Sequence, residues 1–165
     1  TMQAPVRRYA DERPDRVSLK AFLADEIEQG LVSVDEDSPE FILVRVTGNN
    51  MFASGQDSIS PSFLPIFNRI GEELTRTKGR IKVIGHTDSV PIRTTGRFEA
   101  RRFPSNQSLS QARAEEVVRM LSTHVDTGRL TAIGMADKDP LPGIPGEDAR
   151  NRRVEIQVLE RRKGG

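Results

Sequence analysis

The sequence predicts an α/β fold, a two-layer sandwich in which helices pack on one face of a mixed four-stranded sheet. Apolar segments of strand length alternate with segments of helical periodicity, in the order strand, helix, strand, helix, strand, strand. The last of these strands, 154–159, alternates apolar side chains with Glu155 and Gln157. A strand covered by helices on both faces is nearly continuously apolar, so we expect the second sheet face to be wet or only partly covered.

The first forty residues are expected to form an arm and an extra helix ahead of the main domain. Residues 1–17 are polar and rich in arginine, typical of a linker or of a basic membrane-proximal segment. Ser18 suits an N-cap, apolar residues then recur at helical spacing, and Gly30 suits a stop, which predicts a helix over 19–29. A short strand over 31–34 is an additional candidate.

The main domain is expected over 41–160, and a charged tail over 161–165. Its elements are predicted from apolar periodicity, N-capping serines and glycine or proline stops. They are a strand at 41–46, a loop at 49–57, a helix from Ser60 towards Gly79, a strand at 81–85, a helix at 105–124, a short strand at 130–133, a loop at 136–149 and a strand at 154–159.

Composition excludes several classes of function. The 25 Lys and Arg are balanced by 24 Asp and Glu, so bulk charge predicts no nucleic-acid partner. With no cysteine there is neither a disulfide nor a thiolate metal site, and we expect no metal and no cofactor. No apolar run spans a bilayer and no signal peptide is recognisable, so a membrane is expected to be reached only through a segment absent from this chain.

Two motifs predict a site with opposite charges. Asp88 comes at the end of the strand at 81–85, and Asn106, Ser110 and Arg113 share one face of the following helix at spacing i, i+4, i+7. A carboxylate beside a guanidinium suits a ligand that carries both an ammonium and a carboxylate. The alternative is a structural salt bridge between Asp88 and Arg113, which at an exposed position is worth only about 0–1 kcal/mol.

These motifs resemble those of the OmpA-like peptidoglycan-binding family. The resemblance rests on Gly85-His86-Thr87-Asp88, on the 106–121 pattern with Arg113, and on Asn151-Arg152-Arg153-Val154, in that order. Within the family, Pro91-Ile92-Arg93-Thr94 and the run 102–106 are similar to the periplasmic C-terminal extension of TssL, an inner-membrane component of type VI secretion.

The resemblance implies a ligand and the roles of several residues. The ligand is the diaminopimelate of the peptidoglycan stem peptide, with Asp88 accepting from its ammonium and Arg113 binding its carboxylate. The other positions that match the family's pocket are Thr87, Asn106, Leu109, Phe52 and Ala53. For Phe52, anchoring the loop in the core is an equal alternative.

Three neighbouring features carry separate expectations. Arg152 or Arg153 is expected to tie the last strand to the Asp88 loop in a mainly structural role. His86 is expected to pack in the turn, because the one other histidine, His124, lies far along a helix and no metal cluster or nucleophilic triad suggests itself. The connection 89–105 is longer than the family pattern and either covers the pocket, blocks it or contacts a partner.

The predicted function is non-catalytic anchoring of a membrane-embedded type VI secretion complex to the wall. The partners are then the stem peptide and other subunits of the complex, in the periplasm of a Gram-negative bacterium, and the sequence leaves homodimerisation open. The alternatives are an assembly module with a vestigial or covered pocket and a flagellar-stator-like wall anchor. A wall hydrolase is disfavoured, because glycoside cleavage uses paired carboxylates and Asp88 has no acidic partner placed by a motif.

Overall fold

The computed structural model describes residues 19–48, 50–53, 55–91 and 103–159. The predicted arm at 1–17, most of the long connection after Val90 and the predicted tail at 161–165 lie outside these residues. No helix in the described part of the chain is long and apolar enough to cross a membrane.

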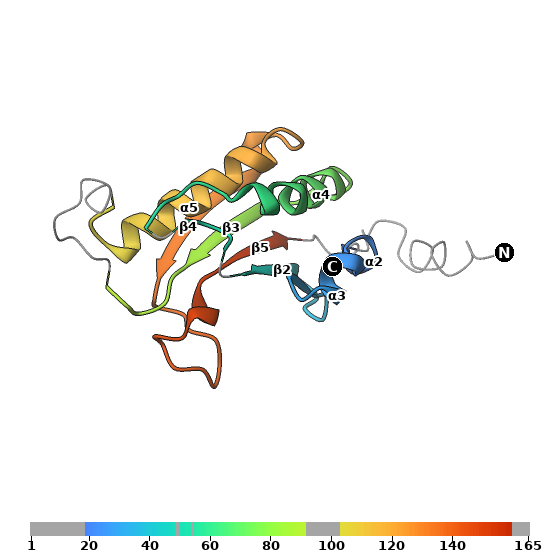
Figure 1. Ribbon diagram of the computed structural model, residues 1–165. Helices are drawn as coiled ribbons and strands as arrows, with labels where there is room; N and C mark the ends of the chain where they lie inside the picture. Colours follow the sequence, from blue (N-terminus) through green and yellow to red (C-terminus); the bar gives the residue numbers. More distant parts are fainter. Residues whose placement is uncertain (1–18, 49, 54, 92–102, 160–165) are drawn as a thin grey trace.

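One mixed sheet organises the molecule (Figure 1). It has five strands in the order β1-β2-β5-β3-β4, with β3 and β4 parallel and every other neighbouring pair antiparallel. The strands are β1 (Val32–Asp35), β2 (Phe41–Thr47), β3 (Ile81–His86), β4 (Leu130–Ala136) and β5 (Arg153–Leu159).

The expected strand number of four is therefore wrong. The fifth strand is β1, the short segment that the sequence indicated only as a candidate. Val32 and Val34 alternate with Ser33 and Asp35, and this period-2 pattern places both valines in the core while the strand pairs with β2.

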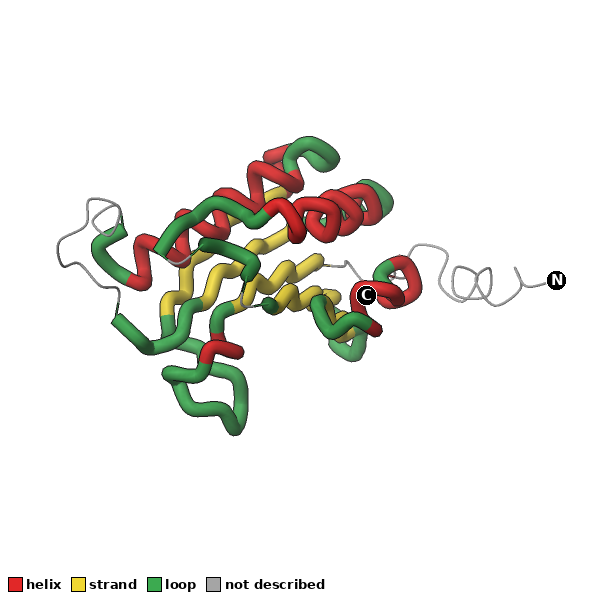
Figure 2. The backbone as a smooth tube through the Cα atoms, in the orientation of Figure 1, coloured by secondary structure: helices red, strands yellow, loops and turns green. Residues whose placement is uncertain are grey.

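Two long helices cover one face of the sheet, as predicted (Figures 1 and 2). They are α4 (Leu64–Leu74), preceded by the 3₁₀ turn η1 (Pro61–Phe63), and α5 (Asn106–Leu121), with the 3₁₀ turns η3 (Thr127–Arg129) and η4 (Ala149–Asn151) in later loops. The core lies between these helices and the sheet, and its fully buried large side chains include Phe67, Ile70, Leu121, Val83 and Ile156.

Helix α5 lies very close to the sheet because glycines face it. An ideal Cβ on Gly85 would come 2.4 Å from the main-chain carbonyl oxygen of Ser110. One on Gly134 would come 2.6 Å from the main-chain nitrogen of Gln111. The two glycines are partners in the parallel β3–β4 pair. Their missing side chains let the helix and the strands approach closely, which fixes the start of α5 beside the end of β3.

The predicted N-terminal helix is present but interrupted. It forms α2 (Leu19–Phe22) and α3 (Ala24–Glu28), separated at Leu23, whose φ of −100° and ψ of 21° leave helical geometry. Leu19 and Leu23 are fully buried in the same core as α4 and the sheet. Arg69 of α4 donates to the Phe22 carbonyl at 2.7 Å, so these helices are fastened to the rest of the fold.

The helix-free sheet face is partly covered, which is one of the two alternatives that the alternation of β5 predicted. Lys82 and Ser33 are exposed there as expected, but Glu155 is only 6 % exposed. It accepts hydrogen bonds from Arg45 Nε at 2.8 Å and Arg153 Nε at 3.0 Å, and its Oε1 lies 2.9 Å from His86 Nε2. The alternation correctly predicted the face to which Glu155 points, and the charged cluster covers that part of the face.

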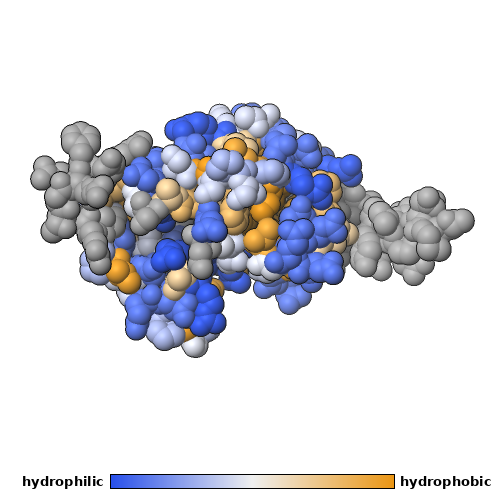
Figure 3. Space-filling view, in the orientation of Figure 1, coloured by the Kyte–Doolittle hydropathy of each residue, from blue (hydrophilic) through white to orange (hydrophobic). Residues whose placement is uncertain are grey.

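The surface seen in Figure 3 is mostly hydrophilic, with a smaller apolar area near its centre. Among the described residues, the exposed large apolar side chains are Leu64 and Val90. Val90 follows Asp88 by two positions, so the rim of the predicted site is partly apolar.

The N-cap of α5 is a local stability determinant that can be tested. Ser105 Oγ accepts the Ser108 amide at 3.1 Å and forms a capping box with that residue. We expect Ser105→Ala to lower the free energy of unfolding by about 1 kcal/mol, measured by urea denaturation. Ser122→Ala at the other end of the helix removes only a hydroxyl that donates to the Arg119 carbonyl, and we expect a change within about 0.5 kcal/mol. Equal losses in both variants would contradict a specific capping role.

Candidate functional site

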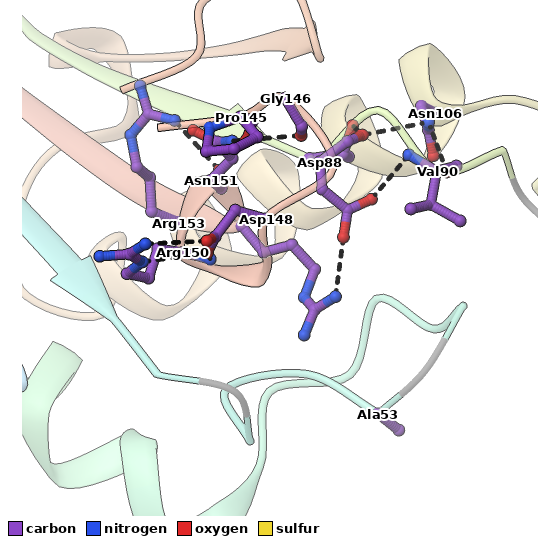
Figure 4. Close-up of polar contacts among 12 residues, drawn as sticks. Ala53, Asp88, Val90, Asn106, Pro145, Gly146, Asp148, Arg150, Asn151 and Arg153 are labelled. Carbon is purple, nitrogen blue, oxygen red and sulfur yellow. Dashed lines mark hydrogen bonds and ion pairs between the residues drawn. The ribbon is translucent and has the colours of Figure 1, made fainter. Parts of the chain in front are cut away.

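The Asp88 carboxylate is held in a tight turn directly after β3. Asp88 is 6 % exposed, and its Oδ1 accepts the Val90 amide at 3.0 Å (Figure 4). Thr87, also buried, receives its backbone support from β4, because its amide donates to the Ala136 carbonyl at 2.8 Å. The Thr87 hydroxyl donates to the Asp88 carbonyl at 2.8 Å, so this side chain shapes the turn.

Asp88 forms an ion pair with Arg152. The distance from Asp88 Oδ2 to Arg152 Nη1 is 2.8 Å, and the Arg152 side chain is 40 % exposed. In the part of the chain that is described, no ion pair joins Asp88 to Arg113, so the alternative of a structural salt bridge between those two is wrong. Among the described residues each carboxylate oxygen of Asp88 has one hydrogen-bond partner, so each can accept a further hydrogen bond.

Arg113 extends from α5 to the loop between β2 and η1. Its Nε donates to the Gln56 carbonyl at 2.8 Å and its Nη2 to the Ala53 carbonyl at 3.2 Å. The guanidinium carbon lies 4.7 Å from the centre of the Phe52 ring, a cation–π contact. Arg113 is therefore the residue that fastens this loop to α5, a contact set that no sequence pattern indicated.

Burial changes the electrostatics of Arg113. Its burial and then the charge of Arg152 lower the pKa of its guanidinium, while Asp57 and Asp88 raise it, giving a pKa of about 10. Arg113 thus stays charged at neutral pH. That its pKa responds to both Arg152 and Asp88 indicates that the three groups share one electrostatic neighbourhood.

Asn106 links the helix to the Asp88 turn. As the first residue of α5, it donates from Nδ2 to the Val90 carbonyl at 3.1 Å and to the Asp88 carbonyl at 3.4 Å (Figure 4). Leu109, one turn later, is buried. Asn106 therefore orients the acid through the main chain of the Asp88 turn.

The loop that leads into β5 braces the same turn. Asn151 is almost fully buried, accepts the Leu141 amide at 2.7 Å and donates to the carbonyls of Pro145 and Gly146 at 2.8 and 3.1 Å (Figure 4). The Gly146 carbonyl in turn accepts the Ser89 amide at 2.9 Å. The Asn-Arg-Arg-Val motif thus positions the Asp88 turn through main-chain contacts as well as through Arg152.

The two adjacent arginines have different partners. Arg152 contacts Asp88, whereas Arg153 donates to Glu155 and to the carbonyls of Asn151 and Asp139. The expectation that one of them ties β5 to the Asp88 loop is met by Arg152. His86, expected to pack in the turn, is buried against Glu155, and its Nδ1 has no hydrogen-bond partner among the described residues.

The structure therefore brings together most of the residues that the sequence indicated. Asn106 binds the main chain of Asp88 at the end of β3 (Figure 4). Arg113 senses the charge of Asp88 and binds the loop that carries Phe52 and Ala53, and Thr87 and Leu109 are buried. Sequence reasoning left open which neighbour pairs with Asp88. The result is one carboxylate that is paired with Arg152 and electrostatically coupled to Arg113, an arrangement that suits binding of a charged ligand. Among the described residues, no group of three or more His, Asp or Glu side chains could hold a metal ion.

Comparisons with known proteins agree with the fold. A family model described as the OmpA family matches residues 51–153. The chain is 41 % identical to the cell wall anchor of the T6SS from Pseudomonas aeruginosa, with a TM-score of 0.75 over 88 % of this chain and 99 % of that one. A MotB-like protein from Desulfovibrio vulgaris is 28 % identical, with a TM-score of 0.73 over 87 % of this chain and 89 % of that one.

Two curated relatives are longer proteins. Motility protein B from Escherichia coli K12 is 32 % identical over 67 % of this chain, and the uncharacterised protein YtxE from Bacillus subtilis is 31 % identical over 66 % of it. The matches cover only 35 % and 44 % of those proteins, respectively, so the chain spans less than half the length of either.

Proposed function

This chain belongs to the OmpA family, and from that premise we propose that it binds peptidoglycan without catalysing a reaction, in the periplasm of a Gram-negative bacterium. The observation that carries the proposal is the site itself. Asp88 is nearly buried at the end of β3 yet retains lone pairs, and the charged Arg113 lies in the same electrostatic neighbourhood. A fixed acid beside a fixed guanidinium suits a ligand with two opposite charges.

The proposed ligand is the diaminopimelate of the stem peptide. Its free end carries an ammonium and a carboxylate on one carbon atom. Asp88 accepts from the ammonium, and Arg113 supplies positive charge for the carboxylate. Asn106 holds the Asp88 turn, and the facing loop with Phe52 and Ala53 closes the other side of the site.

The assembly that this chain anchors is proposed from its similarity to the Pseudomonas cell wall anchor. Identity of 41 % over nearly the whole of that chain favours a type VI secretion complex, reached through a membrane segment outside this sequence. Many weak contacts with a repeating wall hold such a complex by effective concentration. Its other subunits, and a second copy of the chain, are the proposed protein partners.

A flagellar-stator-like anchor is a second candidate, favoured by the 32 % identity to Motility protein B. Both candidates use the same wall chemistry. Co-purification of the full-length protein with the membrane subunits of a secretion complex, or with those of a stator, separates the two.

Sedimentation with purified sacculi tests the wall-binding site. Asp88→Asn keeps the shape of the side chain but removes the charge that pairs with an ammonium, so we expect binding to weaken by about tenfold or more. Arg113 variants are less informative here, because they also release the loop that carries Gln56.

The matched control is Asp148→Asn. Asp148 also forms an ion pair with an arginine, Arg150, but makes no contact with Asp88 among the described residues. It should sediment as the unchanged protein does. Equal sedimentation of Asp88→Asn and the unchanged protein would rule out the site. Absence of sedimentation by the unchanged protein would favour an assembly module with a vestigial pocket.

A further inference from the structure

The outer edge of β4 is a side of the sheet that no strand covers within the described residues. β4 is the last strand in the order β1-β2-β5-β3-β4, and it lies beside α5 (Figure 1). Alternate residues of a strand direct their backbone N–H and C=O groups to the same side. Ala132 and Gly134 are two residues apart, so they present these groups on one side of β4.

Two glutamine side chains of α5 bind this edge. Gln111 accepts the Gly134 amide through Oε1 at 2.8 Å and donates from Nε2 to the Ala132 carbonyl at 3.2 Å. Gln107, one turn earlier, donates from Nε2 to the Gly134 carbonyl at 2.8 Å. A side-chain amide offers the same donor and acceptor as a peptide group. The two glutamines therefore occupy hydrogen-bonding positions that an additional strand would use.

Neighbouring residues hold the Gln111 side chain in this position. Glu115, four residues later on α5, accepts from Gln111 Nε2 at 3.1 Å. A carboxylate accepts hydrogen bonds and donates none, so Oε1 is the atom left for the Gly134 amide. A Cβ on Gly134 would come 2.7 Å from Ser110 Oγ, so the glycine lets α5 lie close enough for its amides to reach β4.

The composition of β4 favours pairing with another strand. Its residues, Leu130–Ala136, include neither a charged side chain nor a proline, and Thr131 is the one polar residue. Uncharged, mostly apolar segments of this length pair with copies of themselves when their edge is free. The opposite edge strand, β1, is only four residues long and ends in the exposed Asp35. β4 is longer and uncharged, so its edge needs another form of protection.

We propose that Gln107 and Gln111 prevent β4 from pairing with the β4 strand of a second copy of this chain. Two free β4 edges would add to each other antiparallel about a two-fold axis and join two sheets into one. With the glutamines in place, an incoming strand must first displace three hydrogen bonds and the side chains that make them. A second copy that assembles with this chain must therefore use another surface. This inference is independent of the ligand of the Asp88 site.

Sedimentation velocity over a range of protein concentrations tests the proposal on the double variant Gln107→Ala/Gln111→Ala. Alanine has the highest helix propensity, so α5 is retained while the edge of β4 is opened. We expect the weight-average mass of the double variant to rise with concentration until it is about twice that of the unchanged protein or more.

Adding a charge to β4 identifies the surface that associates. Thr131 and its neighbour on β3, Lys82, are both exposed. Thr131→Glu therefore adds a charge that Lys82 balances within one copy, while charged side chains on an edge strand oppose its pairing with a second copy. We expect Thr131→Glu, added to the double variant, to return the mass to that of the unchanged protein.

The matched control is the double variant Glu116→Ala/Arg119→Ala. It also replaces two polar side chains of α5 with alanine, but these two pair with each other on the helix surface. Among the described residues neither has a hydrogen bond to β4, so this variant should have the mass of the unchanged protein at every concentration.

Two results would overturn the proposal. A folded Gln107→Ala/Gln111→Ala variant with the mass of the unchanged protein at every concentration would show that the glutamines do not prevent pairing. Association that persists after Thr131→Glu would place the contact on a surface other than β4. If urea denaturation shows that the double variant does not fold, Gln111→Ala alone decides, because it frees the Gly134 amide and the Ala132 carbonyl. An unchanged mass of that variant would overturn the proposal equally.

Discussion

Replacing Glu155 with glutamine should lower the free energy of unfolding by about 3–5 kcal/mol. Glu155 is the acid of the buried charged cluster formed with Arg45, His86 and Arg153. Arg153 is only 4 % exposed, so water cannot solvate its charge once the carboxylate is gone. Most of this destabilisation arises because Arg153 stays charged and buried without a counterion. The net contribution of the intact ion pair to stability is smaller. Chemical denaturation measures the change.

The pH dependence of this effect has a definite sign. Burial raises the pKa of Glu155, but the hydrogen bonds and charges of His86, Arg45 and Arg153 outweigh burial and hold the pKa well below its ordinary value. A carboxyl group with a lowered pKa in the folded state stabilises the fold above its unfolded pKa of about 4.3. The stabilisation by ionised Glu155 is lost as the pH falls towards the pKa that Glu155 has in the folded protein. The difference between the unchanged protein and Glu155→Gln should therefore be full at neutral pH and shrink on acidification below about pH 4.

Glu116→Gln is the matched control for this prediction. Glu116 pairs with Arg119 on the surface of α5, one turn along the helix. A surface pair of this kind contributes about 0–1 kcal/mol, so the control should change stability little at any pH. A difference between the unchanged protein and Glu155→Gln that stays constant between pH 7 and pH 3 would contradict the assignment of the charge to the folded state.

Replacing Gly85 with alanine should destabilise the fold by about 2–3 kcal/mol and weaken wall binding as well. The new Cβ would come 2.4 Å from the Ser110 carbonyl oxygen, which is a backbone atom and cannot rotate away. The strain is relieved only if α5 moves from β3. That movement carries Asn106 and Arg113 away from Asp88, so stability and sacculus binding should fall together. Thermal unfolding and sedimentation with sacculi measure the two effects.

Gly128→Ala is the matched control. It replaces a glycine with alanine without a clash of the new Cβ, so it separates the clash at Gly85 from the general effect of losing a glycine. A Cβ at Gly128 meets its nearest neighbour, Asp126 Oδ1, at 3.6 Å, which is ordinary van der Waals contact. We expect a change in stability within about 0.5 kcal/mol and unchanged binding. If Gly85→Ala behaved like this control, close approach of α5 to the sheet would not be what positions the site.

Local patterns in the sequence were sufficient to place the elements that carry the site. Ile81 and Val83 alternate with Lys82, which identified β3 and therefore the acid at its end. Ser105 and the helical spacing after it identified the start of α5 and the face that carries Asn106 and Arg113. These features depend on neighbours within a few residues, which is why one sequence reveals them.

The exact pairing of charges could not be predicted, because it depends on contacts between distant segments. The sequence indicated that Arg152 or Arg153 ties β5 to the Asp88 loop, but not which of the two does so. Asp88 and Arg152 are 64 residues apart in the chain. The partners of Arg113 are main-chain carbonyls, which every residue carries, so no side-chain pattern identifies them. For Glu155, alternation in β5 indicated the face it points to, but not that Arg45, His86 and Arg153 would cover it.

The adjacent residues Arg152 and Arg153 have different roles, because they pair with different acids. The backbone at Arg152 is extended, with φ of −78° and ψ of 104°, so consecutive side chains leave it in opposite directions. Arg152 reaches Asp88 at the candidate site, and Arg153 reaches Glu155 inside the charged cluster. Slippage of β5 by a single residue would therefore misdirect both at once, so recognition and folding depend on the same alignment.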